Sequence, residues 1–271
     1  MGRVLRWSIG AAGIGFAFLA YIYLTLPDIR SLASQNPDTT AFIELRASQA
    51  HAEGRVAKRE QRWVSYEQIS PNLKRAVLVS EDSAFWQHDG VDMEQLKASI
   101  EQDLERGRMV RGGSTITQQL AKNLYLSPSR NPIRKLRELI ITRRLEAALT
   151  KRRILELYLN VVEWGDGIYG AEAAARTYFH RSAATLGPGE SALLAGALVN
   201  PRLLVPSHPS TRLLRRQRII LSRMGSVAPP PPAPVVPVAV PVVVDPPSVA
   251  PVPEASSESP AADDPPSPQP Q

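Results

Sequence analysis

The stretch RGGSTITQQLAKNLY, residues 111–125, decides the fold class of this 271-residue chain. Apolar residues recur every four positions from Ile116 to Leu124, which predicts an amphipathic helix. Thr115 stands three residues before Gln118, the spacing of a capping box at a helix start. A polar stripe on the opposite face is suited to bind a polar ligand, although a surface helix with a flexible start shows the same pattern. The stripe consists of Thr115, Gln118, Gln119 and Lys122.

Helical periodicity continues on both sides of this stretch, from about residue 62 to residue 224, whereas alternating strand patterns are scarce. Similar apolar repeats run through residues 133–140 and 154–159. Asn131 followed by Pro132 is typical of a helix start, with an N-cap and a proline at the first helical position. We therefore expect residues 62–224 to form one all-α domain.

The N-terminal region contains 20 residues without a charge, residues 7–26. A helix of that length crosses a hydrocarbon core of ~30 Å. Two arginines precede the run and Asp28 follows it, so the positive-inside rule places residues 1–6 in the cytoplasm and the rest of the chain outside. A cleaved signal peptide is the alternative, because residues 31–33 resemble a cleavage site, but the run exceeds the roughly 7–15 residues of an ordinary signal.

Two segments flank the predicted domain. Residues 27–61 show no strong period and are interpreted as a stem, whose structure stays open. Residues 225–271 form a proline-rich tail, since 16 of the 25 prolines fall within 228–271. Proline at that density predicts an extended, disordered segment that serves as a spacer or as a docking strip for another protein.

Charge narrows the class of partner. The tail holds five acids and no Lys or Arg, so the remaining 32 cations and 21 acids give the rest of the chain a formal charge of +11. Such a balance favours an anionic partner: a nucleic acid, a membrane surface or a phosphorylated substrate. The lack of interleaved aromatics and of a nucleic-acid motif argues against the first. The absence of cysteine excludes disulfides and thiolate metal sites.

Two adjacent acids, Glu81 and Asp82, end the apolar run 74–80. Carboxylates are disfavoured at the C-terminus of a helix, so function is one explanation of their position. Adjacent helical positions point about 100° apart, so we expect one acid to face a cleft and the other to hold the following turn. A solvated turn after a core helix fits the residues equally well. His88 suits a structural hydrogen bond better than a catalytic base.

Two glycines, Gly112 and Gly113, precede the helix that starts near residue 116. Free N–H groups at a helix start favour an anion, and glycine lets a ligand approach the backbone closely. The stretch is not a P-loop, because no Gly-Lys-Ser/Thr follows at the required spacing.

Residues 122–153 carry ten cations against two acids, Glu138 and Glu146. A helix that begins at Pro132 places Arg134 and Glu138 one turn apart, with Lys135 beside them. The pair is either an exposed ion pair or part of a clamp that holds a diphosphate, with Arg as a fork and Lys as a point charge.

Four ordered motifs resemble the glycosyltransferase family 51 domain, the peptidoglycan polymerases of bacteria. They are EDSAFWQHDGVD, GGSTITQQLAKN, RKLRE and KRRILELYLN, and the resemblance covers about residues 62–224. The stretch WGDGIYGAEAAARTYFH and the short anchor look most like the monofunctional branch of Gram-negative bacteria. No Ser-x-x-Lys occurs in the chain, so no transpeptidase activity is expected.

The resemblance implies an all-α, lysozyme-like, two-lobed fold and a set of site residues. Glu81 matches the base that takes a proton from the acceptor sugar, and Glu138 matches the second essential carboxylate. Glu156 and Asn160 are expected to brace the site. The residues expected to bind or shape the substrate cleft are Asp82, Phe85, His88, Gly113, Ser114, Thr115, Gln118, Gln119, Lys122, Asn123, Arg134 and Lys135.

The same resemblance implies that the substrate is lipid II and that its polymerisation into β-1,4 glycan inverts the donor carbon and releases undecaprenyl diphosphate. No cofactor is required; a divalent cation, Mg or Mn, is compatible with the diphosphate, and no metal ligand is assigned. The implied partners are lipid II, the growing glycan, the membrane and other cell-wall synthesis or division proteins, but no nucleic acid. The implied location is the inner membrane, with the catalytic domain in the periplasm. A lytic lysozyme-like enzyme and an inactive anchored scaffold are the alternatives.

Overall fold

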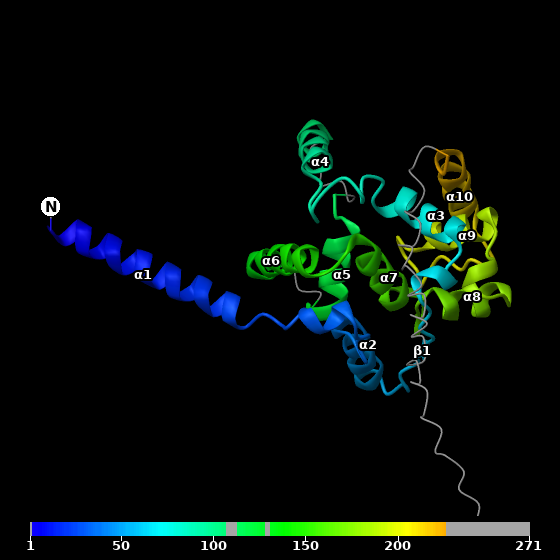
Figure 1. Cartoon of the computed structure of the whole chain (residues 1–271), viewed down its shortest axis with the longest axis horizontal. Coiled ribbons are helices and arrows are strands. Elements are labelled where there is room, and N and C mark those ends of the chain that lie inside the picture. Colours follow the sequence, from blue (N-terminus) through cyan, green and yellow to red (C-terminus); the bar gives the residue numbers. More distant parts are fainter. Residues whose placement is uncertain (1, 107–112, 128–130, 226–271) are drawn as a thin grey trace, which may run out of the picture. The chain divides into compact units, whose positions relative to one another are not determined.

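The computed structural model of the chain describes residues 2–106, 113–127 and 131–225, so almost all of the predicted tail, residues 226–271, lies outside the described residues. Short 3-10 helices, η1 to η3, and three short strands accompany the helices (Figure 1). The elements in chain order are α1 Gly2–Leu24, η1 Arg30–Ala33, α2 Ala41–Ala52, β1 Glu60–Gln61, η2 Tyr66–Gln68, α3 Pro71–Glu81, α4 Met93–Arg106, α5 Ile116–Tyr125, α6 Pro132–Ala148, α7 Lys151–Val161, β2 Glu163–Gly165, β3 Ile168–Tyr169, α8 Ala171–Phe179, η3 Ala183–Thr185, α9 Pro188–Ala197 and α10 Thr211–Arg223.

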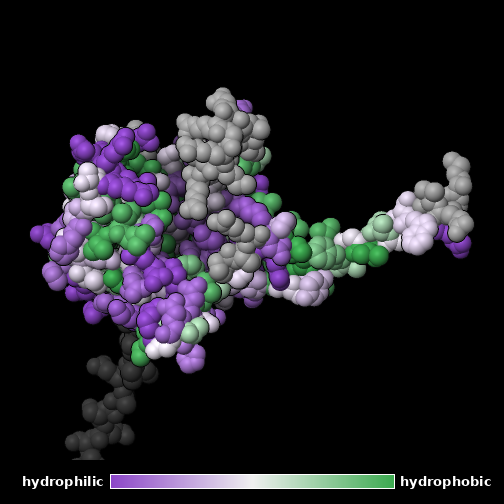
Figure 2. All heavy atoms as spheres, turned by 180° about the vertical axis from the view of Figure 1, so that it is seen from behind, coloured by the Kyte–Doolittle hydropathy of each residue, from purple (hydrophilic) through white to green (hydrophobic). Residues whose placement is uncertain are grey.

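Helix α1 contains the predicted membrane span. Residues Leu5–Leu24 form 20 consecutive helical residues with a mean hydropathy of 1.6, long and apolar enough to cross a bilayer. The helix starts at Gly2, earlier than the charge-free run suggested, because the two N-terminal arginines join the same helix. Its side chains are mostly exposed and apolar, and Figure 2 shows them beside a largely hydrophilic face of the domain. An apolar surface along a helix of this length is unfavourable in water, and the hydrocarbon core of a bilayer would cover it.

Helix α7 lies in the core of the folded domain. Its central residues Leu155, Leu157 and Leu159 are fully buried, as is Tyr158 between them. Thr150 caps the start of the helix by accepting a hydrogen bond from the backbone N–H of Arg153. The second half of the helix, residues 157–161, is buried on all sides, which explains why its apolar residues exceed one helical stripe.

The helices form two packed groups, visible in Figure 1. In the first group, α5 packs against α2, α6 and α7. In the second group, α9 packs against α3 and α10. The predicted all-α, two-lobed architecture is thereby confirmed. Glu81 ends α3 in the second group and is bonded to Gln119 on α5 in the first, so the two groups meet at this acid.

One small sheet accompanies the helices, in the order β1-β3-β2. Strand β1 is parallel to β3, and β2 is antiparallel to β3. Each strand has only two or three residues, too few to produce the alternation that reveals a strand in a sequence.

The segment interpreted as a stem contains ordered structure. Ile29 and Leu32, at the start of η1, are buried in the main hydrophobic core. Helix α2 begins at a Thr40 cap and packs against α5. These apolar residues are too few and too irregularly spaced to show a period, which is why the sequence left the structure of this segment open.

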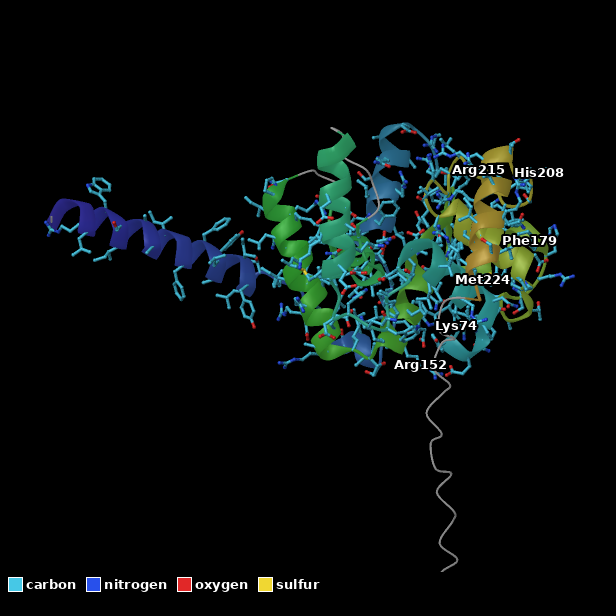
Figure 3. All side chains as sticks on the ribbon, turned by 90° about the horizontal axis from the view of Figure 1, so that it is seen from above. Lys74, Arg152, Phe179, His208, Arg215 and Met224 are labelled. Carbon is cyan, nitrogen blue, oxygen red and sulfur yellow. The ribbon has the colours of Figure 1, made fainter. Side chains whose placement is uncertain are left out.

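Tyr66 in η2 joins the two helix groups. Its ring lies between the Lys74 ammonium of α3, 4.0 Å from the ring centre, and the Arg152 guanidinium of α7, 4.5 Å away. Figure 3 shows Lys74 and Arg152 close together at this junction. Lys74 also donates a hydrogen bond of 2.9 Å to the Tyr66 carbonyl. Burial lowers the pKa of Lys74, so stacking and hydrogen bonding stabilise a cation that solvent no longer stabilises.

Candidate active site

Glu81 occupies the last position of α3, and its two carboxylate oxygens have neutral partners. Oε2 accepts a hydrogen bond of 3.0 Å from Nε2 of Gln119, and Oε1 accepts one of 3.1 Å from the Ser80 hydroxyl. The preceding turns of α3 are fixed by Leu73, Val77 and other fully buried residues. The glutamate is partly exposed, so a packed helix carries a carboxylate that solvent and ligands can reach.

Asp82, the next residue, has a different role. Its Oδ2 accepts a hydrogen bond of 2.9 Å from the Ile116 backbone N–H, and its Oδ1 lies 2.9 Å from Nε2 of His88. His88 Nδ1 accepts from the Gly90 backbone N–H, so Nε2 carries the proton of the neutral ring and donates it to Asp82. The contacts match the expected division: Glu81 remains open, and Asp82 holds the following turn.

The start of α5 does not have the free N–H groups that the sequence suggested. The Ile116 N–H is bonded to Asp82, and the Gln118 N–H is bonded to the Thr115 hydroxyl. The expected anion site at this helix start is therefore wrong for these two groups, because the protein's own carboxylate and cap already occupy them. Gly112 lies outside the described residues, while Gly113 is partly buried and Ser114 is exposed.

Half of the polar stripe of α5 is buried and none of it is fully exposed, so the surface-helix alternative is wrong. Thr115 and Gln118 form the predicted capping box, and the Thr115 hydroxyl also donates to the Gly90 carbonyl at 2.7 Å. Asn123 is also buried. Gln119 and Lys122, one turn further along from the cap, are partly exposed. Two members of the stripe therefore brace the helix start, Gln119 is hydrogen-bonded within the domain, and Lys122 stays partly exposed.

Helix α6 carries the second carboxylate. Glu138 is only 4% exposed, and its carboxylate pairs with the Arg134 guanidinium at 2.6 Å and with the Lys135 ammonium. The predicted helix start is confirmed, because Asn131 caps it and Pro132 occupies its first position. A buried carboxylate with two cations forms a preorganised cluster rather than an exposed pair.

Lys122 on α5 links the two acidic positions. Burial lowers the pKa of Lys122, the negative charge of Glu138 raises it, Arg134 and Lys135 lower it, and Glu81 raises it. The ammonium therefore interacts with both Glu81 and Glu138. A partly desolvated cation that is influenced by the charge of both carboxylates is suited to hold an anionic group.

Three side chains with the spacing of metal ligands are already engaged in hydrogen bonds within the protein. Asp82, His88 and Asp92 offer ligand atoms within 4.8 Å of one another. However, both oxygens of Asp82 are engaged, both ring nitrogens of His88 are engaged, and Asp92 caps α4 through the Gln95 N–H. The donor set therefore fits a braced turn better than a cation site.

Phe85 is a core residue of this turn. It is fully buried, its ring centre lies 4.9 Å from that of Trp86, and the Lys151 ammonium lies 4.6 Å from its ring centre. Of the residues expected to bind or shape the cleft, Phe85, Asp82 and Thr115 are almost fully buried, whereas Gln118 borders an apolar groove together with Lys135.

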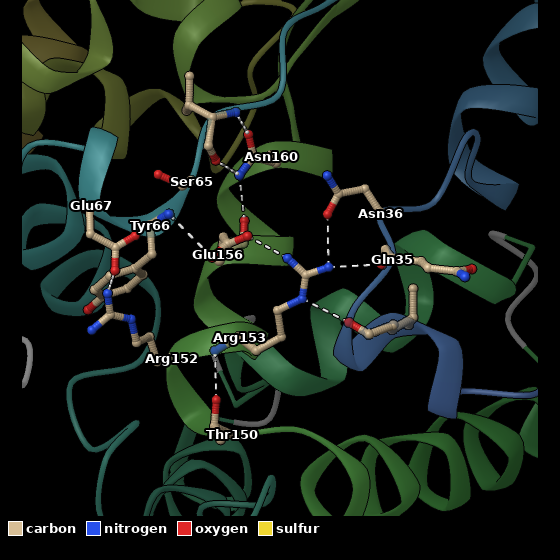
Figure 4. A network of polar contacts seen from close by, with 12 residues as sticks. Gln35, Asn36, Ser65, Tyr66, Glu67, Thr150, Arg152, Arg153, Glu156 and Asn160 are labelled. Carbon is tan, nitrogen blue, oxygen red and sulfur yellow. Dashed lines mark hydrogen bonds and ion pairs between the residues drawn. The ribbon is translucent and has the colours of Figure 1, made fainter. Parts of the chain in front are cut away.

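The expected bracing residues hold the segment before α3 (Figure 4). The Asn160 side chain accepts from the Val64 N–H at 3.0 Å and donates to the Val64 carbonyl at 2.9 Å. Glu156 accepts from the Tyr66 N–H at 3.2 Å and pairs with Arg153. Both residues thereby attach α7 to the backbone that leads into the Glu81 helix.

Two residues near the site were not predicted. The Tyr158 hydroxyl donates to Oε1 of Gln119 at 3.0 Å. Glu146 accepts from the Thr117 hydroxyl at 2.6 Å and from Lys151 at 2.8 Å. A tyrosine inside an apolar helical run is a usable signal, because a buried hydroxyl normally needs a hydrogen-bond partner.

Comparisons with known proteins agree with this geometry. Residues 48–225 match the family described as Transglycosylase, and the chain belongs to this family, as the four motifs predicted. Its fold is the lysozyme-like fold of that family, and the chain is a transglycosylase.

Several curated relatives are named biosynthetic peptidoglycan transglycosylase. The protein of Laribacter hongkongensis is 46% identical over 83% of this chain and 99% of its own length. That of Thiobacillus denitrificans is 48% identical over 85% of this chain and 100% of its own length. That of Aromatoleum aromaticum is 51% identical over 70% of this chain and 82% of its own length.

Proposed function

We propose that this chain polymerises lipid II into β-1,4 glycan from a single-pass membrane anchor. The observation that carries the proposal is the contrast between two carboxylates: Glu81 accepts hydrogen bonds from neutral groups, whereas Glu138 pairs with two cations. The charges of both acids raise the pKa of the Lys122 ammonium, which burial lowers. The names of the curated relatives support the same reaction.

Glu81 acts as the general base. Its carboxylate takes the proton from the 4-hydroxyl of the acceptor N-acetylglucosamine, and that oxygen forms a bond to C1 of the donor N-acetylmuramic acid. The bond between C1 and the diphosphate oxygen breaks, with inversion at C1. A positioned general base contributes roughly 10²–10⁴ in rate.

The basic cluster stabilises the departing diphosphate. Arg134 presents a planar fork, Lys135 is half exposed, and Lys122 adds a third cation from a different helix. Glu138 keeps Arg134 and Lys135 in position before the substrate arrives. Cations arranged in advance at developing negative charge contribute about 3–4 kcal/mol per well-placed donor. A divalent cation that arrives with the diphosphate would add further positive charge.

The membrane supplies the lipid substrate. Helices α4 and α6 border an apolar groove of about 840 Å³ that includes Met93 and Leu139. Both of these side chains are exposed, and a contiguous exposed apolar surface suits contact with lipid tails. The Arg137 guanidinium on α6 donates a hydrogen bond to the hydroxyl of Thr25, the residue directly after α1. This contact holds α6 next to the end of the membrane span.

We place the span in the inner membrane and the catalytic domain in the periplasm. The two arginines before the span favour a cytoplasmic N-terminus. Retention of the anchor is supported by the fold, because Leu32, in the middle of the cleavage-like sequence, is buried. Its carbonyl also accepts a hydrogen bond of 2.8 Å from Arg153 on α7. Cleavage there would cut inside the packed domain.

The test is polymerisation of labelled lipid II by the full chain in vesicles. Glu81→Gln keeps the length and hydrogen-bonding capacity of the side chain but removes the base. We expect a loss of about 10²–10⁴ in kcat with an unchanged melting temperature. Full activity of this variant would refute the proposed role of Glu81.

The same assay separates the alternatives. A polymerase lengthens glycan from lipid II, whereas a lytic enzyme shortens preformed glycan. An inactive scaffold leaves both substrates unchanged, and its cellular phenotype would survive Glu81→Gln. The cluster of Glu138 and its cations favours the polymerase, because a hydrolase of neutral glycan has no diphosphate to stabilise.

A further inference from the structure

Two consecutive hydrogen bonds connect Tyr158, Gln119 and Glu81, which lie on three different helices. Tyr158 on α7 donates to Oε1 of Gln119 on α5, and Nε2 of Gln119 donates to Oε2 of Glu81 on α3. Both hydrogen bonds measure 3.0 Å. The carboxylate proposed as the base is therefore connected to helix α7, in the core of the domain, through one amide.

The direction of these hydrogen bonds is fixed by chemistry. An ionised carboxylate only accepts, so Gln119 must turn its NH₂ group towards Glu81. Its carbonyl oxygen then faces Tyr158, and the phenol must donate. If the amide turned over, two oxygens would face each other at Glu81 and the contact would become repulsive. The Tyr158 hydroxyl thus pairs the amide oxygen in the one orientation that an ionised Glu81 accepts, and it adds a second hydrogen bond that stabilises this orientation.

Tyr158 is well suited to hold this orientation. Its side chain is fully buried among the core residues of α7, so the ring has no space to swing away. Burial raises the pKa of Tyr158 well above its ordinary value, and the charges of Glu81 and Asp82 raise it further. The hydroxyl therefore keeps its proton and donates throughout the range in which an enzyme of this kind works.

We propose that Tyr158 is a positioning residue that orients Gln119 and, through it, the carboxylate of Glu81. This inference rests on the proposed role of Glu81 as the base. Tyr158 does not contact the substrate or the reacting atoms. It fixes the orientation of the Gln119 amide, which in turn holds the Glu81 carboxylate.

Other buried tyrosines provide a control that distinguishes the hydrogen bond of the Tyr158 hydroxyl from the packing of its ring. Tyr169 is 1% exposed and Tyr66 is 3% exposed, and neither hydroxyl has a hydrogen-bond partner within the described part of the chain. Tyr169 belongs to β3, on a different element from the site. Tyr169→Phe therefore removes a buried hydroxyl without disturbing the hydrogen bonds that connect Tyr158 to Glu81, which makes it a matched control.

The experiment measures lipid II polymerisation by the full chain against pH. For Tyr158→Phe we expect a fall in kcat of about 10-fold, the effect of one hydrogen bond, with KM changed less than 2-fold. The acid limb of the pH–rate profile moves to higher pH, because the ionised carboxylate loses a fixed donor when the amide is free to turn. Tyr169→Phe should keep the kcat and the pH profile of the parent.

A double-mutant cycle tests the route through Gln119. In a Gln119→Met background the hydroxyl has no acceptor, so adding Tyr158→Phe should change kcat less than 2-fold. If Tyr158→Phe alone unfolds the protein, the double variant should recover its melting temperature, because no carbonyl is then left unpaired. Independent, multiplying effects of the two substitutions would overturn the proposal.

The outcomes also separate this inference from the proposed function. If Glu81→Gln is inactive while Tyr158→Phe keeps the parent kcat and acid limb, only the positioning role is overturned. If Glu81→Gln is fully active, the proposed base is wrong, and the positioning role is overturned with it.

Discussion

The end of α3 and the first turns of α6 each carry a glutamate of the candidate site, but the surroundings of the two acids differ. Glu81 accepts hydrogen bonds from Ser80 and Gln119, which are neutral groups. Glu138 pairs with the cations Arg134 and Lys135 and is almost fully buried. Neutral donors hold a carboxylate in place and leave it able to take a proton, whereas cations make protonation costly. The partners, rather than the shared residue type, therefore separate the proposed roles of the two acids.

The largest effect is expected when one of the two cations paired with Glu138 is removed. Arg134→Ala deletes one guanidinium at the proposed diphosphate site, and we expect kcat to fall about 10²–10³-fold, the effect of one well-placed donor. Steady-state polymerisation of lipid II measures the loss.

The chain offers a matched control for this change. Arg176 pairs with Glu172 at 2.6 Å with the same spacing of four residues, and that glutamate is also buried. Arg176→Ala should leave kcat within about 2-fold of the parent, as expected for an ion pair outside the site. A comparable loss in both variants would mean that the effect of Arg134 is one of folding.

A smaller effect is expected at Asp82 and concerns stability. Asn at this position can accept from the Ile116 N–H or from His88, but its NH₂ group then faces the other donor. A tautomer change in His88 does not help, because it would cost the hydrogen bond from Gly90. Asp82→Asn should therefore lower the free energy of unfolding by about 1–3 kcal/mol, measured by urea titration.

Glu81→Gln is the reference for that titration, because its neutral partners tolerate an amide. The unfolding free energy of this variant should stay within about 0.5 kcal/mol of the parent. Equal destabilisation by the two neighbouring substitutions would contradict the division between an open acid and a bracing acid.

The smallest effect is a shift in pH dependence at Lys122. Burial is the main cause that lowers the pKa of this ammonium below the ordinary value of 10.5. Below the lowered pKa the side chain is charged and can hold the diphosphate; above it, the charge is lost. The alkaline limb of kcat/KM should therefore fall at a lower pH than an ordinary lysine would give.

Lys122→Arg checks this assignment, because guanidinium remains charged in proteins. Its alkaline limb should move to higher pH, with a modest loss of kcat/KM from the altered shape. An alkaline limb at an unchanged pH would assign that limb to another group.

Much of the fold followed from local sequence, because caps and periodicity act over a few residues. The start of α6 at Asn131 and Pro132 and the capping box of α5 were both predicted and confirmed. The sheet was not expected, because its strands have only two or three residues and β1 pairs with β3 about 100 positions away, as Glu60 does with Ile168. A strand of two residues is too short to show an alternating pattern, so the sequence does not indicate which distant strand it pairs with.

The site was predicted in composition but not in its internal contacts. The motifs gave Glu81, Glu138 and the cations, yet they did not show that Asp82 occupies the start of α5. That contact joins residues 34 positions apart and occupies one of the N–H groups expected to bind an anion. Tyr158 was interpreted only as part of an apolar run, since a sequence does not show which polar atom a buried hydroxyl reaches.

The short connection between the membrane span and the core limits how far the domain can travel. Residues 25–28 separate the end of α1 from Ile29, the first residue buried in the main core. Five steps along an extended chain reach at most ~18 Å. For the proposed anchored polymerase, this length keeps the catalytic domain close to the bilayer surface, where a lipid-borne substrate arrives by lateral diffusion. In this arrangement the enzyme stays at the membrane while the glycan strand grows away from it.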